Sequence, residues 1–308
     1  MLILTLPQVH QKDLLKDMIA HPLVKAVRYN TGTNSAYSPR ETLRRISTLA
    51  QPFKKPVYVD LKAKQLRVVE WANLPEGPIV LNHRITVTLP ATVCFRGDDR
   101  SQLCEVVDGN QIYVDPLPKY PVGRGQAVNI LAPDLKIEGG LLPADHDYIE
   151  AALAEGMSRF MLSFVENMDD VRELENAIGR YRKSRTKTPC EIVLKIESRA
   201  GIDFVAKTET SLLRPYRLMA ARDDLMIQIG INAMPDALKI IIEKDRHAIC
   251  ASRLLMGLET GAISMADVSD LEYMKSLSYG IFMLSDSISR NHFRPAMDFW
   301  LSYTGGTP

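Results

Sequence analysis

The 308-residue sequence lacks several features that mark major protein classes. Its four cysteines are far apart and form no C-x-x-C pair, which argues against a structural zinc site or a redox dithiol. We therefore expect reduced, mostly buried thiols, as in a cytoplasmic protein. There is no run of about 18 apolar residues, and residues 2–6 are too short and lack the basic flank of a secretory leader. A soluble protein without a membrane segment is expected.

Neither sign of charge dominates the chain. Lys and Arg number 38 against 37 Asp and Glu, and no basic run or face stands out. Because nucleic-acid binding needs such a concentration of positive charge, we expect small molecules as partners and no nucleic acid. The length suits one large α/β domain, or a barrel of about 250 residues that carries an insertion.

Short apolar segments alternate with amphipathic helical segments in the first and last parts of the chain. Strands are predicted at residues 2–6, 26–30, 57–60, 160–164, 192–197, 218–224, 248–252 and 280–285. A helix start is marked by Ser38 and Pro39, with Glu41 completing a capping box. Eight such strands predict an α/β protein with a (β/α)8 TIM barrel. A doubly wound open sheet is the alternative, but its usual Gly-rich first turn is absent.

The alternation breaks at residues 68–133, where we find no helical period. This stretch has β-rich pieces, a hairpin signal at Asp108-Gly109, and Pro and Gly clusters at both ends. We therefore predict a small β-barrel-like domain at 68–133, inserted after the third strand of a barrel formed by residues 1–67 and 134–308.

Polar side chains end most of the predicted barrel strands. They are Arg28, Asn30, Asp60, Ser163, Lys195, Glu197, Asp224 and Ser252. The active site of such a barrel is built from the C-terminal ends of several strands. Carboxylates that converge with a lysine and an arginine suit one divalent cation and an anionic substrate, because Mg²⁺ takes oxygen ligands and keeps waters. A purely structural rim of salt bridges is the alternative, but it does not explain why every strand contributes.

These residues, in this order, resemble motifs of the pyruvate kinase family. Residues 195–201 (KIESRAG) resemble K-I-E-N-x-x-G, and residues 221–225 (ARDDL) resemble A-R-G-D-L. Residues 28–30 (RYN), with Tyr37, Glu41 and Thr42, are similar to R-L-N-F-S-H-G-x-x-x-Y-x-x-x-E-T, and residues 60–67 to D-T-K-G-P-E-I-R. Residues 249–252 (ICAS) are similar to I-C-A-T. The resemblance implies a barrel with a β domain inserted after its third strand.

The resemblance also implies roles for individual residues. Glu197 and Asp224 would hold Mg²⁺ or Mn²⁺, Lys195 would neutralise the phosphoryl group in transfer, and Arg28 would grip the phosphate. Ser252 stands where the family has a threonine near the enolate. The remaining assignments are Asp223, Asp224, Arg67 and Ser163 for substrate binding, Tyr37 and Arg124 for nucleotide binding, and Asn30 and Asp60 as the remnant of a monovalent-cation site.

Departures from the family pattern gather around the potassium and nucleotide positions. Gly32 and Leu61 replace the other two potassium ligands, so we predict that potassium is not required, with Lys64 or Arg253 as the substitute charge. Arg253 itself stands where the family has a glutamine. Asp223 replaces a glycine, and its carboxylate would repel an anionic substrate unless it points away. The family's C-terminal regulatory domain has no counterpart in these residues, so we expect hyperbolic kinetics without a response to sugar phosphates.

Three functions stay open on the sequence alone. The first is a cytoplasmic, glycolytic kinase that transfers phosphate from phosphoenolpyruvate to a nucleoside diphosphate and releases pyruvate. The second is a divergent relative that uses the enolate of pyruvate for decarboxylation or carbon–carbon cleavage of a 2-oxo acid. The third is a non-catalytic regulatory relative, which the retained Lys195 disfavours. Expected partners are phosphoenolpyruvate or pyruvate and a nucleotide, with no membrane, and a homo-oligomer is left open.

Overall fold

The computed structural model describes residues 1–96, 99–182 and 189–305, which form two compact units. One unit comprises Met1–Leu61 together with Pro143–Pro308, and the other comprises Lys62–Leu142. The second unit contains the residues 68–133 that the sequence predicts as an inserted domain.

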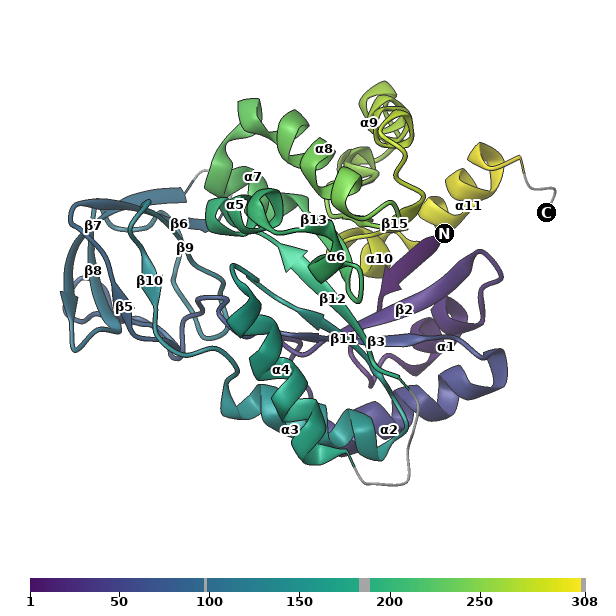
Figure 1. The fold of residues 1–308 in the computed structure, drawn as a ribbon, viewed down its shortest axis with the longest axis horizontal. Helices are drawn as coiled ribbons and strands as arrows, with labels where there is room; N and C mark the ends of the chain where they lie inside the picture. The colour runs from purple at the N-terminus through teal and green to yellow at the C-terminus, as the bar shows by residue number, and fades with distance from the viewer. Residues whose placement is uncertain (97–98, 183–188, 306–308) are drawn as a thin grey trace. The chain divides into compact units, whose positions relative to one another are not determined.

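Among the described residues of the first unit, eight parallel strands close into a barrel (Figure 1). In order around the barrel they are β1 (Leu2–Thr5), β15 (Ile281–Met283), β14 (Ile249–Ala251), β13 (Arg217–Ala221), β12 (Glu191–Ile196), β11 (Arg159–Leu162), β3 (Val57–Leu61) and β2 (Val24–Asn30). Leu2 of β1 pairs with Phe282 of β15, which closes the barrel between the two ends of the chain. The predicted (β/α)8 fold is confirmed.

Helices follow the strands in sequence and surround the barrel (Figure 1). The α-helices are α1 (Lys12–Ala20), α2 (Pro39–Ala50), α3 (Pro143–Ala154), α4 (Met168–Tyr181), α5 (Arg199–Lys207), α6 (Thr210–Leu213), α7 (Arg222–Ile229), α8 (Met234–Lys244), α9 (Met265–Ser276), α10 (Asp286–Asn291) and α11 (Phe293–Tyr303). The 3-10 helices are η1 (Gln51–Phe53), η2 (Ile231–Ala233) and η3 (Met256–Thr260). In the described ranges, no single helix is long and apolar enough to span a membrane. Helix α7 and the segment Ile231–Lys244 reach this length and apolarity only when taken together, and the two are bent by 113° relative to each other.

Local side-chain chemistry explains where two of these helices begin. Ser38 accepts a hydrogen bond from the backbone N–H of Glu41 at 3.3 Å, as expected for the N-cap of α2. The predicted capping box is not completed, because the Glu41 carboxylate forms an ion pair with Arg45 at 2.7 Å. At α4, Asn167 and Asp170 do form a reciprocal capping box.

The barrel interior is filled by apolar side chains that point inward from all eight strands. This interior layer consists of Ile3, Ala26, Tyr58, Met161, Val193, Met219, Ala221, Ile249, Ala251 and Met283. Successive side chains of a strand point to opposite faces, so the layer fixes which residues further along each strand also point inward.

The second unit is built from antiparallel strands. A five-stranded sheet has the order β4 (Ile79–Val80), β8 (Gln111–Asp115), β7 (Asp99–Val107), β6 (Ala91–Arg96) and β9 (Asn129–Leu131). A smaller sheet pairs β5 (Ile85–Thr86) with β10 (Lys136–Ile137). Asp108 and Gly109, with φ of 51° and 76°, turn the chain between β7 and β8, which confirms the predicted hairpin turn.

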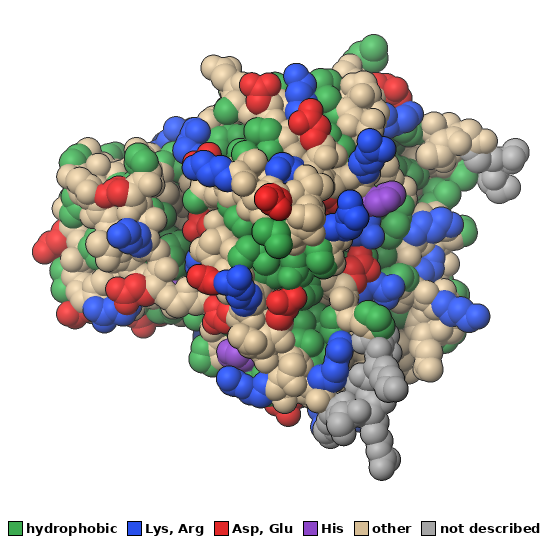
Figure 2. All heavy atoms as spheres, viewed as in Figure 1, with side chains coloured by type: hydrophobic (Ala, Val, Ile, Leu, Met, Phe, Trp, Pro, Cys, Tyr) green, Lys and Arg blue, Asp and Glu red, His purple; other side chains and the backbone are tan. Residues whose placement is uncertain are grey.

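The surface carries charges of both signs. Figure 2 shows Lys and Arg side chains interspersed with Asp and Glu on the visible face of the barrel unit. All four cysteines are unpaired; Cys94 and Cys250 are buried, Cys190 is partly buried and Cys104 is exposed.

Candidate active site

Strand alternation directs the polar residues at the strand ends into the mouth of the barrel. Val193 belongs to the interior layer, so Lys195 and Glu197, two and four positions later, point the same way. The other pairs related in this way are Ile3 and Thr5, Ala26 and Arg28, Tyr58 and Asp60, and Met161 and Ser163. The C-terminal mouth therefore collects a polar layer directly above the apolar one.

Lys195 links three strands at the centre of this layer. Its Nζ lies 3.2 Å from Asp60 Oδ1 and 3.1 Å from Glu197 Oε1, and it donates to Ser163 Oγ at 2.7 Å. Ser163 in turn donates to the carbonyl of Leu61 at 2.8 Å, so its lone pair is directed at the lysine. Burial acts to lower the pKa of Lys195, but the carboxylates of Asp60 and Glu197 outweigh it and raise the pKa. The ammonium group is therefore a fixed positive charge.

Glu197 and Asp224 are the predicted metal ligands. Glu197 Oε2 accepts a hydrogen bond from the backbone N–H of Phe164 at 2.8 Å, while Oε1 faces Lys195. Burial raises the pKa of Glu197, and the negative charge of Asp224 adds to the increase. A divalent cation would relieve this repulsion, so the donor set fits Mg²⁺ or Mn²⁺.

The chain alone does not complete a metal site. Within the described ranges, no group of three or more His, Cys, Asp or Glu side chains could hold a metal ion. Glu197 and Asp224 would therefore need oxygen atoms from a substrate or from water to complete the coordination of a hard cation.

Asp224 comes from a helix, and the predicted strand at residues 218–224 is wrong at its end. Strand β13 ends at Ala221 and α7 begins at Arg222, so Asp223 and Asp224 lie in the first turn of α7. Acidic residues in this position are stabilised by the helix dipole. Arg222 itself is anchored to Asp270 of α9 through two contacts of 2.6 and 2.9 Å, so its guanidinium group joins two helices.

Asp223 and Arg253 neutralise each other at the barrel mouth. The two side chains form an ion pair of 2.9 Å, and both are about half exposed. Ser252 and Arg253 have φ of 66° and 57°, in the left-handed region, so the chain bends sharply after β14. The sequence predicts that the Asp223 carboxylate repels an anionic substrate unless it points away. In the structure Arg253 balances its charge, and the effect on a substrate stays a prediction.

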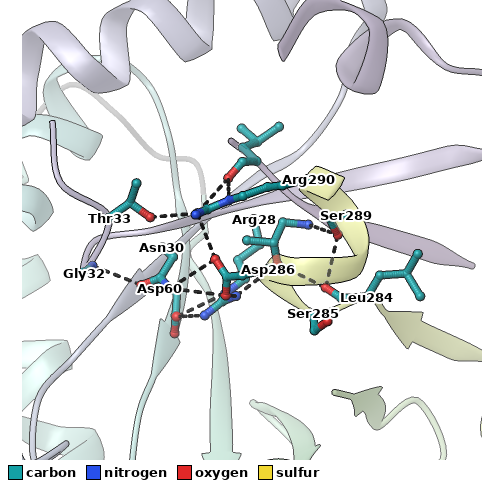
Figure 3. Close-up of polar contacts among 12 residues, drawn as sticks. Arg28, Asn30, Gly32, Thr33, Asp60, Leu284, Ser285, Asp286, Ser289 and Arg290 are labelled. Carbon is teal, nitrogen blue, oxygen red and sulfur yellow. Dashed lines mark hydrogen bonds and ion pairs between the residues drawn. The ribbon is translucent and has the colours of Figure 1, made fainter. Parts of the chain in front are cut away.

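Arg28, the predicted phosphate-binding residue, lies in a polar network (Figure 3). Its Nε and Nη2 both donate to Asp60 Oδ2, the former at 3.1 Å. Its Nη1 donates to Thr5 Oγ1 at 3.0 Å and to Asp286 Oδ2 at 3.1 Å. Burial acts to lower the pKa of Arg28, but Asp60 and Asp286 raise it well above its ordinary value. The guanidinium group is thus held from three sides.

Sequence reasoning missed Asp286 and Arg290. The two residues lie one turn apart on α10, and Arg290 Nη2 is 2.9 Å from Asp286 Oδ1. Arg290 Nη2 also donates to Thr33 Oγ1 at 3.0 Å. The only signal for them was an acid in the first turn of a helix followed by arginine at i+4, a pattern typical of ordinary surface helices.

The predicted remnant of a monovalent-cation site is engaged in internal contacts. Asn30 Oδ1 accepts from the backbone N–H of Gly32 at 3.0 Å, and Asn30 Nδ2 is 3.4 Å from the Asp286 carboxylate. Asp60 binds Arg28 and Lys195. These contacts support the prediction that potassium is not required, which stays a prediction.

The remaining assignments also stay predictions. The Tyr37 ring lies under the Arg45 guanidinium group, 4.1 Å from its centroid. Arg67 and Arg124 belong to the Lys62–Leu142 unit, where Arg67 donates to Gln65 Oε1 at 3.0 and 2.8 Å.

Comparison with known proteins shows the family of the chain. A family model described as pyruvate kinase, barrel domain, matches residues 102–274, which is more than half of the chain. The chain belongs to the pyruvate kinase family. The pyruvate kinase of Thermotoga maritima is 24% identical over 295 residues, covering 86% of this chain and 61% of that protein. The pyruvate kinase of Thermococcus litoralis is 28% identical over 299 residues, covering 86% and 60%.

Solved pyruvate kinase structures share the fold. The enzyme from Pyrobaculum aerophilum superimposes with a TM-score of 0.73 at 16% identity, covering 98% of this chain and 72% of that one. The enzyme from Cryptosporidium parvum gives 0.71 at 19% identity, covering 94% and 65%. This member of the pyruvate kinase family spans about three-fifths of the length of the two curated relatives above.

Proposed function

We propose that this pyruvate kinase family member transfers phosphate from phosphoenolpyruvate to a nucleoside diphosphate, giving pyruvate, in a reaction that needs Mg²⁺ or Mn²⁺. The observation that carries the proposal is the buried ammonium group of Lys195, held by Asp60, Glu197 and Ser163 at the barrel mouth. A protein catalyses phosphoryl transfer mainly by positioning the reactants and by placing positive charge near the transferred group.

Each group in the mouth has a proposed task. During transfer the bond between phosphorus and the enol oxygen breaks, and a bond to an oxygen of the nucleotide forms. Lys195 and Arg28 stabilise the negative charge on the phosphoryl oxygens because both are fixed, charged donors. Glu197 and Asp224 would hold the divalent cation, which supplies Lewis acidity towards substrate oxygens. The enolate then takes a proton at carbon, on the side assigned to Ser252.

The formal charges of the mouth favour joint binding of a cation and an anion. Apart from Asp223 and Arg253, which neutralise each other, the groups are three cations (Arg28, Lys195 and Arg290) and four carboxylates (Asp60, Glu197, Asp224 and Asp286). Their sum is one negative charge, which opposes a substrate with several negative charges. A divalent cation reverses the sign, so phosphoenolpyruvate should bind more tightly when the metal is present.

The test is an assay of pyruvate and nucleoside triphosphate formation from phosphoenolpyruvate and a panel of nucleoside diphosphates. We expect the two products in equal amounts with Mg²⁺ or Mn²⁺, no product in the presence of a chelator, and recovery when the metal is restored. Pyruvate release without nucleoside triphosphate, or no product with any nucleotide, would contradict the proposal.

One observation favours a second candidate, the use of the pyruvate enolate in 2-oxo acid chemistry. The Asp223–Arg253 ion pair places two charges at the mouth where the family motifs have glycine and glutamine. The second candidate predicts exchange of the C3 hydrogens of pyruvate with deuterium, or decarboxylation of a 2-oxo acid, without any nucleotide. Deuterium exchange in the absence of phosphate transfer would favour it over the kinase.

A further inference from the structure

Of the three hydrogen-bond partners of Arg28 described above, Asp286 is more exposed than Asp60 and Thr5. A guanidinium group has five N–H donors. Among the described contacts, four of them are used: two for Asp60, one for Thr5 and one for Asp286. Asp60 and Thr5 are fully buried, whereas the Asp286 side chain is 39% exposed. Asp286 is therefore the one partner that solvent or a ligand can reach.

A phosphate or carboxylate group that binds Arg28 strongly takes two parallel N–H donors. Only one donor is left while all four contacts persist, so the incoming anion has to replace an existing partner. If Asp60 or Thr5 gave up its contact with Arg28, a buried polar group would lose a hydrogen-bond partner, which is costly. Asp286 can leave, because its carboxylate is already partly solvated.

Asp286 has a second partner within reach (Figure 3). Its Oδ1 lies 2.9 Å from Arg290 Nη2, and both of its oxygens lie 3.4 Å from Asn30 Nδ2. Arg290 is held in place by Thr33 Oγ1 at 3.0 Å and by the carbonyl of Leu6 at 3.3 Å. A rotation of the Asp286 side chain would free one N–H of Arg28 Nη1, while the other N–H stays bonded to Thr5 and the ion pair with Arg290 is kept.

We propose that Asp286 is a displaceable counter-ion of Arg28. Its carboxylate occupies the place of an anionic ligand group in the free protein, and it leaves Arg28 and keeps its ion pair with Arg290 when a phosphate or carboxylate binds. Asp286 thereby lowers the affinity of Arg28 for weakly bound anions and sets which ligands compete successfully. This inference rests on the proposed function in one respect, that an anionic group binds at Arg28.

The experiment measures binding without turnover. Inorganic phosphate and, separately, phosphoenolpyruvate are titrated by calorimetry into the wild type, Asp286→Asn, Arg290→Met and the double variant. Asp286→Asn should bind phosphate about two- to five-fold more tightly, the factor that corresponds to a partly exposed ion pair. Arg290→Met should bind it several-fold more weakly, because Asp286 loses its alternative partner. In the double variant, the effect of the Arg290 substitution should disappear.

A matched control separates local competition from net charge. Asp298→Asn removes the same charge from an exposed site on α11 and should leave phosphate affinity unchanged. The gain in Asp286→Asn should also persist at high salt, where the effect of distant exposed charges is screened.

Two results would overturn the inference. One is an Asp286→Asn protein that binds phosphate no more tightly than the wild type. The other is strict additivity of the Asp286 and Arg290 substitutions, because net charge alone would then explain both. If the wild type does not turn over phosphoenolpyruvate but Asp286→Asn still binds phosphate more tightly, the proposed function fails and this inference stands. If the wild type turns over phosphoenolpyruvate and Asp286→Asn binds phosphate no more tightly than the wild type, this inference fails and the proposed function stands.

Discussion

Asp60 is the carboxylate shared by two buried cations, and its removal gives a sharp stability prediction. Its Oδ1 lies 3.2 Å from Lys195 Nζ, and its Oδ2 accepts from Nε and Nη2 of Arg28. The side chains of Asp60, Lys195 and Arg28 are 0%, 6% and 9% exposed. Asp60→Asn keeps the shape of the side chain but removes its charge. We expect the variant to unfold more easily because two cations then share fewer buried anions.

The size of the effect follows from the geometry. Lys195 Nζ and Asp60 Oδ1 are 3.2 Å apart. At an effective dielectric constant of 20, two opposite unit charges at this distance attract each other by about 5 kcal/mol. Breaking a buried ion pair by removing one partner costs about 3–5 kcal/mol. Lys195 keeps Glu197 and Arg28 keeps Asp286, so we expect the lower end, about 3 kcal/mol. At about 2–4 °C per kcal/mol, the melting temperature should fall by about 6–12 °C.

The assay is urea denaturation and scanning calorimetry of the wild type and Asp60→Asn side by side. Asp298→Asn, an exposed substitution with the same charge change, should stay within about 0.5 kcal/mol of the wild type. An Asp60→Asn protein as stable as the wild type, or more stable, would refute the reasoning that Asp60 compensates the two buried cations.

Three further predictions concern the metal, potassium and pH. Glu197→Gln and Asp224→Asn should each abolish metal-dependent turnover and leave the circular dichroism spectrum unchanged; full turnover of either would remove that residue from the metal site. Turnover should be independent of potassium in tetramethylammonium buffer, because Asn30 is already engaged within the chain, and a many-fold loss that potassium restores would contradict this. Burial acts to raise the pKa of Glu191, but hydrogen bonds from Tyr58 and two arginines outweigh it and lower the pKa. Glu191 should therefore stabilise the fold above the unfolded glutamate pKa of about 4.3 and lose this contribution as the pH falls through its lower folded value. Comparing the unfolding free energies of the wild type and Glu191→Gln at neutral and acidic pH measures this, and a difference that grows on acidification would show the sign to be wrong.

The barrel could be predicted because its signals are local. The stretch before Lys195 is an uninterrupted apolar run, as a parallel strand buried on both faces requires. Once the strand was placed, alternation was enough to direct Lys195 and Glu197 to the same face. The same reasoning placed Arg28, Asp60 and Ser163 at the mouth without knowledge of any contact.

Features that depend on pairs of distant residues could not be read from local patterns. Asp286 meets Arg28 across 258 positions of the chain, and no period or motif connects them. The end of β13 was misplaced because an apolar run followed by acids describes equally well a strand end and the first turn of a helix. The ion pair between Asp223 and Arg253 could not be predicted either. Asp223 alone is interpreted as a carboxylate that repels the substrate, and Arg253 alone as a substitute for the potassium charge.

In the proposed reaction, the fixed ammonium group of Lys195 supports phosphoryl transfer at the barrel mouth. The most direct measurement is the rate of pyruvate formation from phosphoenolpyruvate and ADP by Lys195→Met beside the wild type. Circular dichroism checks the fold in parallel, and electron paramagnetic resonance of added Mn²⁺ checks the metal site. We predict that turnover falls by at least about 10²–10³-fold while the fold and Mn²⁺ binding are kept. A folded Lys195→Met enzyme whose turnover stays close to that of the wild type would show that Lys195 does not support the transfer.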